Sequence, residues 1–176
     1  QAIVDRVNQQ VGEPYMTLED IAEYEPISRE AACGLFHNYN ICTMSPPSSA
    51  LAMIQILGKL EANGLPETPT GGLWADYSEA GRLAYADRAK YLGDPFFMGS
   101  PNITSDEVVA ALLDPAYLQE RAKLIGASAA LQVAPGDPLK GRLELDRATA
   151  LQEEVPGTSH FSIRDSYGNI VSMTGT

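Results

Sequence analysis

Few side-chain patterns in this sequence could carry out a chemical reaction. Its two histidines, His37 and His160, do not lie at metal-ligand spacing from the two cysteines, Cys33 and Cys42. The sequence also lacks a G-x-S-x-G serine elbow, a phosphate-binding glycine loop and a dinucleotide-binding glycine motif. Ser48–Ser49 follows two prolines, where helix capping explains a serine better than nucleophilic catalysis does. We therefore expect no metal site, and we look for chemistry in the C-terminal part.

The stretch that begins at Pro156 offers one chemical possibility, centred on Thr158. A charged segment rich in proline and glycine ends at Gly157, and Thr158 opens a strand pattern. If the Gly157–Thr158 peptide were cut, the Thr158 hydroxyl would lie beside its own α-amine, whose pKa of roughly 7.7–8.0 suits a general base. The same hydroxyl can make the cut by attacking the Gly157 carbonyl, which gives an ester that water resolves. From these residues alone, an ordinary loop threonine is the more common interpretation.

A longer motif covers the same stretch. From Thr158 to Thr176 the sequence follows T-x-H-x-S-x-x-D-x-x-G-x-x-V-x-x-T-x-T, and in this it resembles the start of the small subunit of γ-glutamyltranspeptidases. Upstream, Met44–Ala50 resembles the proline–serine turn of that family, and Arg82–Pro95 resembles its long helix and exit. Thr17–Asp20 and Tyr117–Arg121 fit it as well. The resemblance covers nearly the whole chain in the order of the family.

The resemblance implies an N-terminal-nucleophile hydrolase, made as one precursor that cleaves itself into a large and a small subunit. By position, Gly157 and Thr158 are then the processing site, Thr158 is the mature nucleophile, and Thr176 supports its hydroxyl. His160 matches the motif histidine, for which an orienting role competes with a purely structural one.

The implied reaction passes the γ-glutamyl group of glutathione, or of another γ-glutamyl amide, to water or to an amino-acid or peptide amine. It proceeds through an acyl-enzyme and needs no metal or organic cofactor, because the amine supplies the base and fixed donors stabilise the oxyanion. The expected partners are this substrate, its acceptor and the remainder of both subunits.

The sequence departs from the family pattern at three places. Ala50 replaces a glycine, Phe96 replaces an aspartate, and Cys33–His37 replaces a hairpin rich in glycine, tyrosine and arginine. Two alternatives stay open: a β-lactam or glutaryl acylase on the same scaffold, and a non-catalytic or unprocessed homologue or isolated helical domain. The family's other substrate-binding residues are expected outside these residues, so the chain alone is expected to be inactive.

The elements that must position Thr158 are predicted to be mainly α-helical. Apolar spacing and capping residues predict helices over about 1–11, 17–24, 50–62 and 74–92, and further helices that open after Thr104 and at Asp114–Pro115, the last ending near Gly126. Ser49 is the expected N-cap of the third helix. Hairpins are predicted near 27–43 and around the turn at 166–169.

The predicted organisation has three parts. Residues 1–126 form a helical domain, the C-terminal part of the large subunit. Residues 127–157 form a linker that ends at the processing site, and 158–176 form the truncated first hairpin of the small subunit. The complete protein, by resemblance, is an αββα sandwich. Both ends of the sequence lie inside helical or strand patterns, which indicates a piece of a larger protein.

Cys33 and Cys42 leave two interpretations open. Buried free thiols are the common case for cysteine. However, a two-residue turn at His37–Asn38 would pair Phe36 with Tyr39 and Cys33 directly with Cys42, with Cβ atoms ~4.5–5.5 Å apart, near disulfide range. A disulfide would imply an oxidising compartment, in agreement with the periplasmic or secreted location that the resemblance suggests.

Composition excludes several classes of partner. The 176 residues include 12 Lys and Arg and 23 Asp and Glu, which gives a net charge of −11. Such a chain lacks the basic face that nucleic acids or anionic membrane surfaces require. No apolar run approaches the ~18 residues of a membrane span, whereas the hydrophobic fraction of 44% is sufficient for a core.

Overall fold

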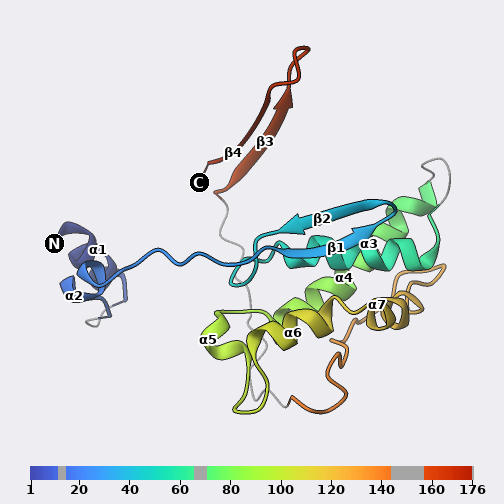
Figure 1. Cartoon of the computed structure of the whole chain (residues 1–176), viewed down its shortest axis with the longest axis horizontal. Coiled ribbons are helices and arrows are strands. Elements are labelled where there is room, and N and C mark those ends of the chain that lie inside the picture. Colours follow the sequence, from blue (N-terminus) through green and yellow to red (C-terminus); the bar gives the residue numbers. More distant parts are fainter. Residues whose placement is uncertain (12–14, 66–70, 144–156, 176) are drawn as a thin grey trace. The chain divides into compact units, whose positions relative to one another are not determined.

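The computed structural model describes residues 1–11, 15–65, 71–143 and 157–175 (Figure 1). Within these ranges the chain forms seven helices and two antiparallel hairpins, which confirms its mainly helical character. The elements are α1 (Ala2–Val11), α2 (Leu18–Ala22), β1 (Ala32–Phe36), β2 (Tyr39–Thr43), α3 (Leu51–Asn63), α4 (Gly71–Tyr91), α5 (Pro95–Met98), α6 (Ser105–Leu112), α7 (Pro115–Ala122), β3 (Ser159–Arg164) and β4 (Ile170–Gly175). They divide into two compact units, Gln1–Leu143 and Glu144–Thr176.

Local capping residues start the short helices as predicted. Thr17 Oγ1 accepts a hydrogen bond from the Asp20 amide at 3.2 Å, and the Asp20 carboxylate accepts one from the Thr17 amide at 2.7 Å. Thr104 and Glu107 form the same reciprocal pair at the start of α6. The Asp114 side chain caps α7, whose first residue is a proline. These contacts satisfy amides that a helix start would otherwise leave unpaired.

Several predicted boundaries are wrong. The first hairpin spans 32–43 rather than 27–43, since strand pairing begins with Ala32 opposite Thr43. The N-cap of α3 is Ala50, without a side-chain bond, rather than Ser49. Helix α7 ends at Ala122 rather than near Gly126, because tighter i to i+3 bonds follow it. Helix α2 ends at Ala22, not Tyr24.

Helix α3 is the central element of the first unit, where it packs against α4, α7 and the hairpin β1–β2. Its buried side chains therefore lie on more than one side: Leu51, Ala52, Ile54, Gln55, Ile56, Lys59 and Leu60. At Gly58 the helix comes very close to α7, since a Cβ atom there would lie 2.6 Å from Leu118 Cδ1. A residue larger than glycine would require the Leu118 side chain to move.

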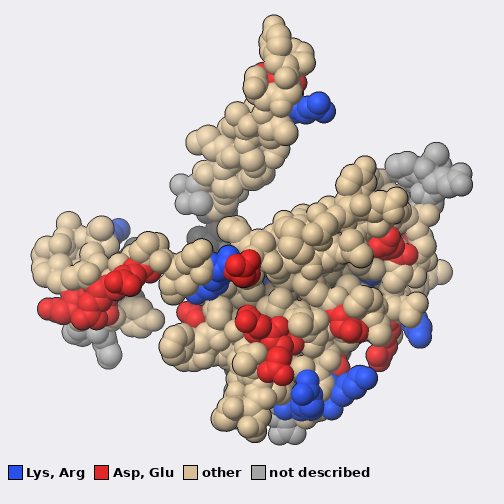
Figure 2. All heavy atoms as spheres, in the orientation of Figure 1, with Lys and Arg blue, Asp and Glu red and all other residues tan. Residues whose placement is uncertain are grey.

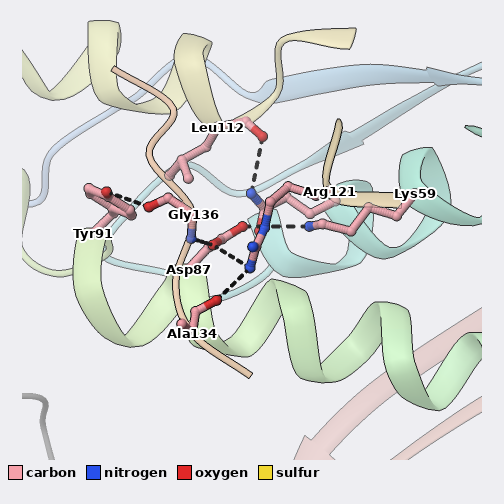
Figure 3. A network of polar contacts seen from close by, with 8 residues as sticks. Lys59, Asp87, Tyr91, Leu112, Arg121, Ala134 and Gly136 are labelled. Carbon is pink, nitrogen blue, oxygen red and sulfur yellow. Dashed lines mark hydrogen bonds and ion pairs between the residues drawn. The ribbon is translucent and has the colours of Figure 1, made fainter. Parts of the chain in front are cut away.

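A buried polar network joins α3, α4 and α7 (Figure 3). Asp87 on α4 is completely buried, and its carboxylate lies 3.2 Å from Arg121 Nη2 and 3.7 Å from Lys59 Nζ. The Gly136 amide donates to Asp87 Oδ1 at 2.8 Å. Charged residues on a helix are rarely buried unless they are paired, yet Asp87 and Glu79 of α4 are both buried.

The Cys33–Cys42 pair forms a disulfide. The two cysteines lie directly opposite each other in the β1–β2 register, with Phe36 opposite Tyr39 at the turn. His37 begins that turn with a positive φ of 52°, a conformation that few non-glycine residues adopt. The alternative of two free thiols is therefore wrong.

Replacing Lys59 with methionine should remove a pH-dependent contribution to stability. Burial lowers the pKa of Lys59 to about 8, against the opposing attraction of Asp87. Between about pH 8 and the ordinary lysine pKa near 10.4, the unfolded chain therefore binds more protons than the folded one. The free energy of unfolding should rise with pH across this window, by up to about 3 kcal/mol from this group. Below about pH 8 Lys59 is charged in the folded protein, and the full cost of burying that charge destabilises the fold.

Urea unfolding of the wild type and of Lys59→Met from pH 7 to 10.5 measures this effect. The wild type should gain stability relative to Lys59→Met as the pH rises, whereas the exposed-site control Lys123→Met should track the wild type. A difference between wild type and Lys59→Met that stays constant with pH would contradict the burial of a charged lysine.

Reducing the disulfide should destabilise the first unit. The two cysteines are 9 positions apart, and closing a loop of that size stabilises a fold by about 2–3 kcal/mol in the chain-entropy account. Urea unfolding with and without a thiol reductant should show this loss in the wild type but not in the Cys33→Ala/Cys42→Ala double variant. Equal midpoints for oxidised and reduced wild type would contradict the prediction.

Candidate functional site

The second unit presents Thr158 at the head of a regular hairpin. Thr158 is exposed and directly precedes β3, with Gly157 before it. Strands β3 and β4 pair without a bulge from Ser159 opposite Gly175 to Arg164 opposite Ile170. The backbone next to Thr158 is therefore held by a continuous ladder.

The turn that connects the strands is organised by Asp165. Its Oδ1 atom accepts hydrogen bonds from the amides of Tyr167 and Asn169, both at 2.9 Å, and its Oδ2 atom accepts one from Asn169 Nδ2 at 2.7 Å. The bonds from Asn169 and Tyr167 lower the pKa of the Asp165 carboxyl. Gly168 provides the positive φ, 89°, that the turn requires. The predicted turn at 166–169 is confirmed.

One face of the hairpin carries a ladder of polar side chains around His160. The Nδ1 atom of His160 lies 2.8 Å from Thr174 Oγ1 on the opposite strand. Its Nε2 atom lies 3.1 Å from Ser162 Oγ and 3.2 Å from Ser172 Oγ. Because hydroxyls on both strands occupy both ring nitrogens, the imidazole is fixed in orientation. This geometry suits a residue that holds the two strands in alignment. It is less suited to a general base, which needs a free ring nitrogen.

The opposite face of the same hairpin is apolar. Phe161, Ile163, Val171 and Met173 alternate with the polar ladder and remain roughly half exposed, as expected from the two-residue period of a strand. Arg164 and Asp165 are the two charged residues of 157–175, and Figure 2 shows the rest of the hairpin surface as uncharged. The hairpin thus has one polar face and one face suited to packing.

The structure brings only some of the predicted site residues together. Thr158 and His160 share the second unit and are two positions apart, with Thr158 directly before β3 and His160 within it. Thr176 lies outside the described residues. Cys33 and Cys42 belong to the first unit. Among the residues described, His, Cys, Asp and Glu do not form a group of three that could hold a metal ion.

Sequence reasoning missed two sets of polar residues. Ser162 and Ser172 complete the contacts of His160. A symmetric turn at 166–169 would place Ser162 opposite Met173, whereas the strands pair Ser162 with Ser172, so the sequence did not reveal this contact. The network around Asp87 left no signal in the spacing of residues, since its members come from three separate helices.

No helix among the described residues has both the length and the apolar character needed to cross a membrane.

Comparison with known proteins places this geometry in a family. The sequence model of the gamma-glutamyltranspeptidase family matches residues 1–176. The chain is 34% identical over 170 residues to the glutathione hydrolase proenzyme of Bacillus subtilis (strain 168), which covers 92% of this chain and 28% of that protein. It is 33% identical over 160 residues to the acylase ACY 1 proenzyme of Pseudomonas sp. (strain SE83), with 89% and 25% covered. The chain thus spans about a quarter of the length of these relatives.

Solved structures give the same result. The gamma-glutamyltranspeptidase of Helicobacter pylori matches 82% of this chain and 41% of its own, with a TM-score of 0.62 and 29% identity. The cephalosporin acylase of Bacillus halodurans matches 99% of this chain and 28% of its own, with a TM-score of 0.67 and 25% identity. Since the family model covers the full sequence and the fold agrees with solved relatives, this chain belongs to the gamma-glutamyltranspeptidase family.

Proposed function

We propose that the protein containing this chain cleaves itself at Gly157–Thr158 and then transfers or hydrolyses γ-glutamyl groups through Thr158. The observation that carries the proposal is the placement of Thr158, an exposed threonine directly before a strand whose ladder holds the adjacent backbone. Family membership supports the reaction class. In this proposal 1–126 and 127–157 belong to the large subunit, and the small subunit of an αββα sandwich begins at Thr158.

The proposed cleavage needs no reagent other than water. Thr158 Oγ attacks the Gly157 carbonyl carbon, the C–N bond breaks, and the Thr158 nitrogen leaves as an amine that takes up the hydroxyl proton. Water then attacks the ester, returning a proton to Oγ and leaving a carboxylate on Gly157. Glycine before the bond leaves its carbonyl open to attack because it has no side chain.

The same atoms serve the turnover of substrate. The free α-amine of Thr158 accepts the proton as Oγ attacks the γ-glutamyl carbonyl, and it returns that proton to the leaving amine. Water or an acceptor amine then releases the acyl group. An α-amine has an ordinary pKa of roughly 7.7–8.0, so a substantial fraction of it is unprotonated slightly above neutral pH.

Two further side chains receive roles in this proposal. His160, held by Thr174, Ser162 and Ser172, aligns β3 with β4 next to the nucleophile. Thr176 supports the Thr158 hydroxyl, a role that rests on its position in the family motif. His160 is thus a positioning residue, while Thr158 carries the chemistry.

A second candidate function has a specific observation in its favour. Acylases occur among both the sequence relatives and the structural neighbours of this chain. The same nucleophile would then open a β-lactam or glutaryl side-chain amide, with the difference lying in residues outside this chain. An unprocessed homologue, or an isolated helical domain, is the remaining alternative and predicts an uncut chain.

We also propose a periplasmic or secreted location. The Cys33–Cys42 disulfide supports it, since such bonds persist mainly in oxidising compartments.

Substituting Thr158 with alanine in the full-length protein should abolish both cleavage and turnover. Without the hydroxyl there is no attack on Gly157, and without cleavage there is no free amine to act as base. Denaturing electrophoresis and release of an aniline from a γ-glutamyl anilide measure the two effects. Ser159→Ala, which removes a hydroxyl one position away, is the matched control and should cleave normally.

The outcome separates the candidate functions. Normal cleavage of Thr158→Ala would rule out the proposed nucleophile. If the wild type cleaves but hydrolyses a glutaryl anilide in preference to the γ-glutamyl anilide, the acylase alternative replaces the transferase.

Changing His160 to glutamine should lower kcat more than it alters KM. The contacts of the His160 ring align the strand next to Thr158, and in this proposal they are not part of the substrate pocket. Their loss should therefore change the position of the Thr158 hydroxyl in the reaction more than it changes substrate binding. We expect kcat to fall by about tenfold, less than the roughly 100-fold that a 1 Å misplacement of a reacting group can cost. The control is Tyr167→Phe at the hairpin tip, 90% exposed. An unchanged kcat, or a rise in KM alone, would exclude a positioning role.

A further inference from the structure

The Cys33–Cys42 disulfide lies on the outward face of the hairpin β1–β2, and the proposed reaction does not use it. Both cysteines are exposed, whereas Ala32 on the other face is buried. This alternation follows the two-residue period of a strand, and the inner face packs against α3 (Figure 1). Exposed disulfides are more labile toward thiols than buried ones, and regulatory disulfides are often of this kind.

Contacts other than the disulfide hold the hairpin at its turn, at its open end and along its inner face. The His37 amide at the turn donates a hydrogen bond to Glu61 Oε1 on α3 at 2.7 Å. At the open end, the Ser45 hydroxyl donates to the Glu30 carbonyl. Gly34 packs so closely on α3 that a Cβ atom there would collide with a side chain of that helix. We therefore expect both strands to stay in place when the disulfide opens.

A hollow beside Cys42 carries an exposed charged side chain of each sign. It has a volume of about 770 Å³, and its lining includes Cys42, Arg29 and Glu30. A hollow of this size accommodates a small peptide. The guanidinium of Arg29 suits a carboxylate, and the carboxylate of Glu30 suits an ammonium group. The charges therefore match a zwitterionic thiol, that is, a short peptide with a cysteine side chain, a free amine and a carboxylate.

The two sulfur atoms of the disulfide differ in their surroundings. Cys33 Sγ lies 3.9 Å from the Ala31 carbonyl oxygen, a distance at which a thiol, a weak donor, can form a hydrogen bond. Attack at Cys42 frees Cys33, which then has this acceptor for its proton. The geometry therefore favours Cys42 as the sulfur that receives the incoming thiol, on the side of the hollow that carries Arg29 and Glu30.

We propose that Cys33–Cys42 is a thiol-exchange site that takes a zwitterionic peptide thiol as a mixed disulfide on Cys42. The thiolate of the peptide attacks Cys42 Sγ, so that a new S–S bond forms and the Cys33–Cys42 bond breaks. Cys33 leaves as a thiolate and takes up a proton. The peptide thiol is the only co-reactant, and attack of Cys33 on the mixed disulfide reverses the step. The inference is independent of the proposed function, because neither cysteine takes part in the proposed cleavage or turnover.

Exchange rates in the full-length protein test this inference. The probes are glutathione and cysteinylglycine, the peptide that remains when the γ-glutamyl group of glutathione is removed. Under native conditions the rate of disulfide opening should rise linearly with thiol concentration, as measured by maleimide labelling of the freed cysteine and mass spectrometry. Thr158→Ala is measured beside the wild type, because the proposed turnover would otherwise consume glutathione during the assay.

Leu60→Ala separates exchange in the folded protein from exchange through unfolding. The substitution weakens the apolar cluster between α3 and α4 and leaves the hairpin unchanged in sequence. Exchange in the folded protein should stay within about twofold of the wild-type rate. Exchange that requires unfolding should accelerate by about thirtyfold or more, as expected for a truncated core leucine, and this result would overturn the proposal.

Arg29→Gln and Glu30→Gln test the class of thiol. Each should slow exchange with both peptide thiols by about threefold, the effect expected from one exposed ion pair. Neither should change the rate with mercaptoethanol, which carries no charge. Lys123→Gln removes an exposed cation elsewhere and is the matched control. Equal slowing with all three thiols, or no slowing with the peptides, would contradict recognition of a zwitterion. The peptide that loses more of its rate in Arg29→Gln is the better ligand of the hollow.

The position of the attached peptide completes the test. Mass spectrometry of the quenched protein should find the peptide on Cys42 and the maleimide on Cys33. The reverse distribution, or a disulfide that resists both peptide thiols in the native protein, would overturn the proposal. A protein that exchanges but never cleaves at Gly157–Thr158 defeats the proposed function alone, whereas one that cleaves but does not exchange defeats this inference alone.

Discussion

The first unit depends on one buried carboxylate. Asp87 contacts Lys59 from α3, Arg121 from α7 and the amide of Gly136, so a single side chain on α4 links two neighbouring helices to an irregular segment. Removing a charged partner would leave a buried charge less compensated, which is strongly destabilising. The apolar core determines that α3, α4 and α7 pack together, while Asp87 determines where the chain goes after α7.

The second unit holds the backbone next to one exposed residue, Thr158. Its ladder runs from Ser159 to Arg164 without interruption, and Asp165 closes the turn with three hydrogen bonds. The ring of His160 contacts hydroxyls on both strands. This combination leaves Thr158 exposed beside a rigid backbone, which suits a nucleophile that must also carry its own base. The half-exposed apolar face is suited to packing against another apolar surface.

Local features of the fold were predictable from the sequence, and non-local ones were not. The capping pairs at Thr17 and Thr104 and the turn near Gly168 depend on neighbouring residues, whose spacing is visible in the sequence. The pairing of Cys33 with Cys42 follows from the length of one turn. In contrast, Asp87 meets Lys59 and Arg121 only after three helices have packed, and before that its position resembles any charged position on a helix. The interpretation of Thr158 as a nucleophile comes from the motif around it, because the spacing of residues near a single threonine does not distinguish it from any other threonine.

The central claim concerns one peptide bond, and intact mass spectrometry of the purified full-length protein tests it most directly. The account predicts two polypeptides that meet at Gly157 and Thr158, with masses that together equal the precursor plus one water. The smaller-subunit polypeptide should begin with a free threonine amine. A single uncut chain, or a cut at any other bond, would contradict the account.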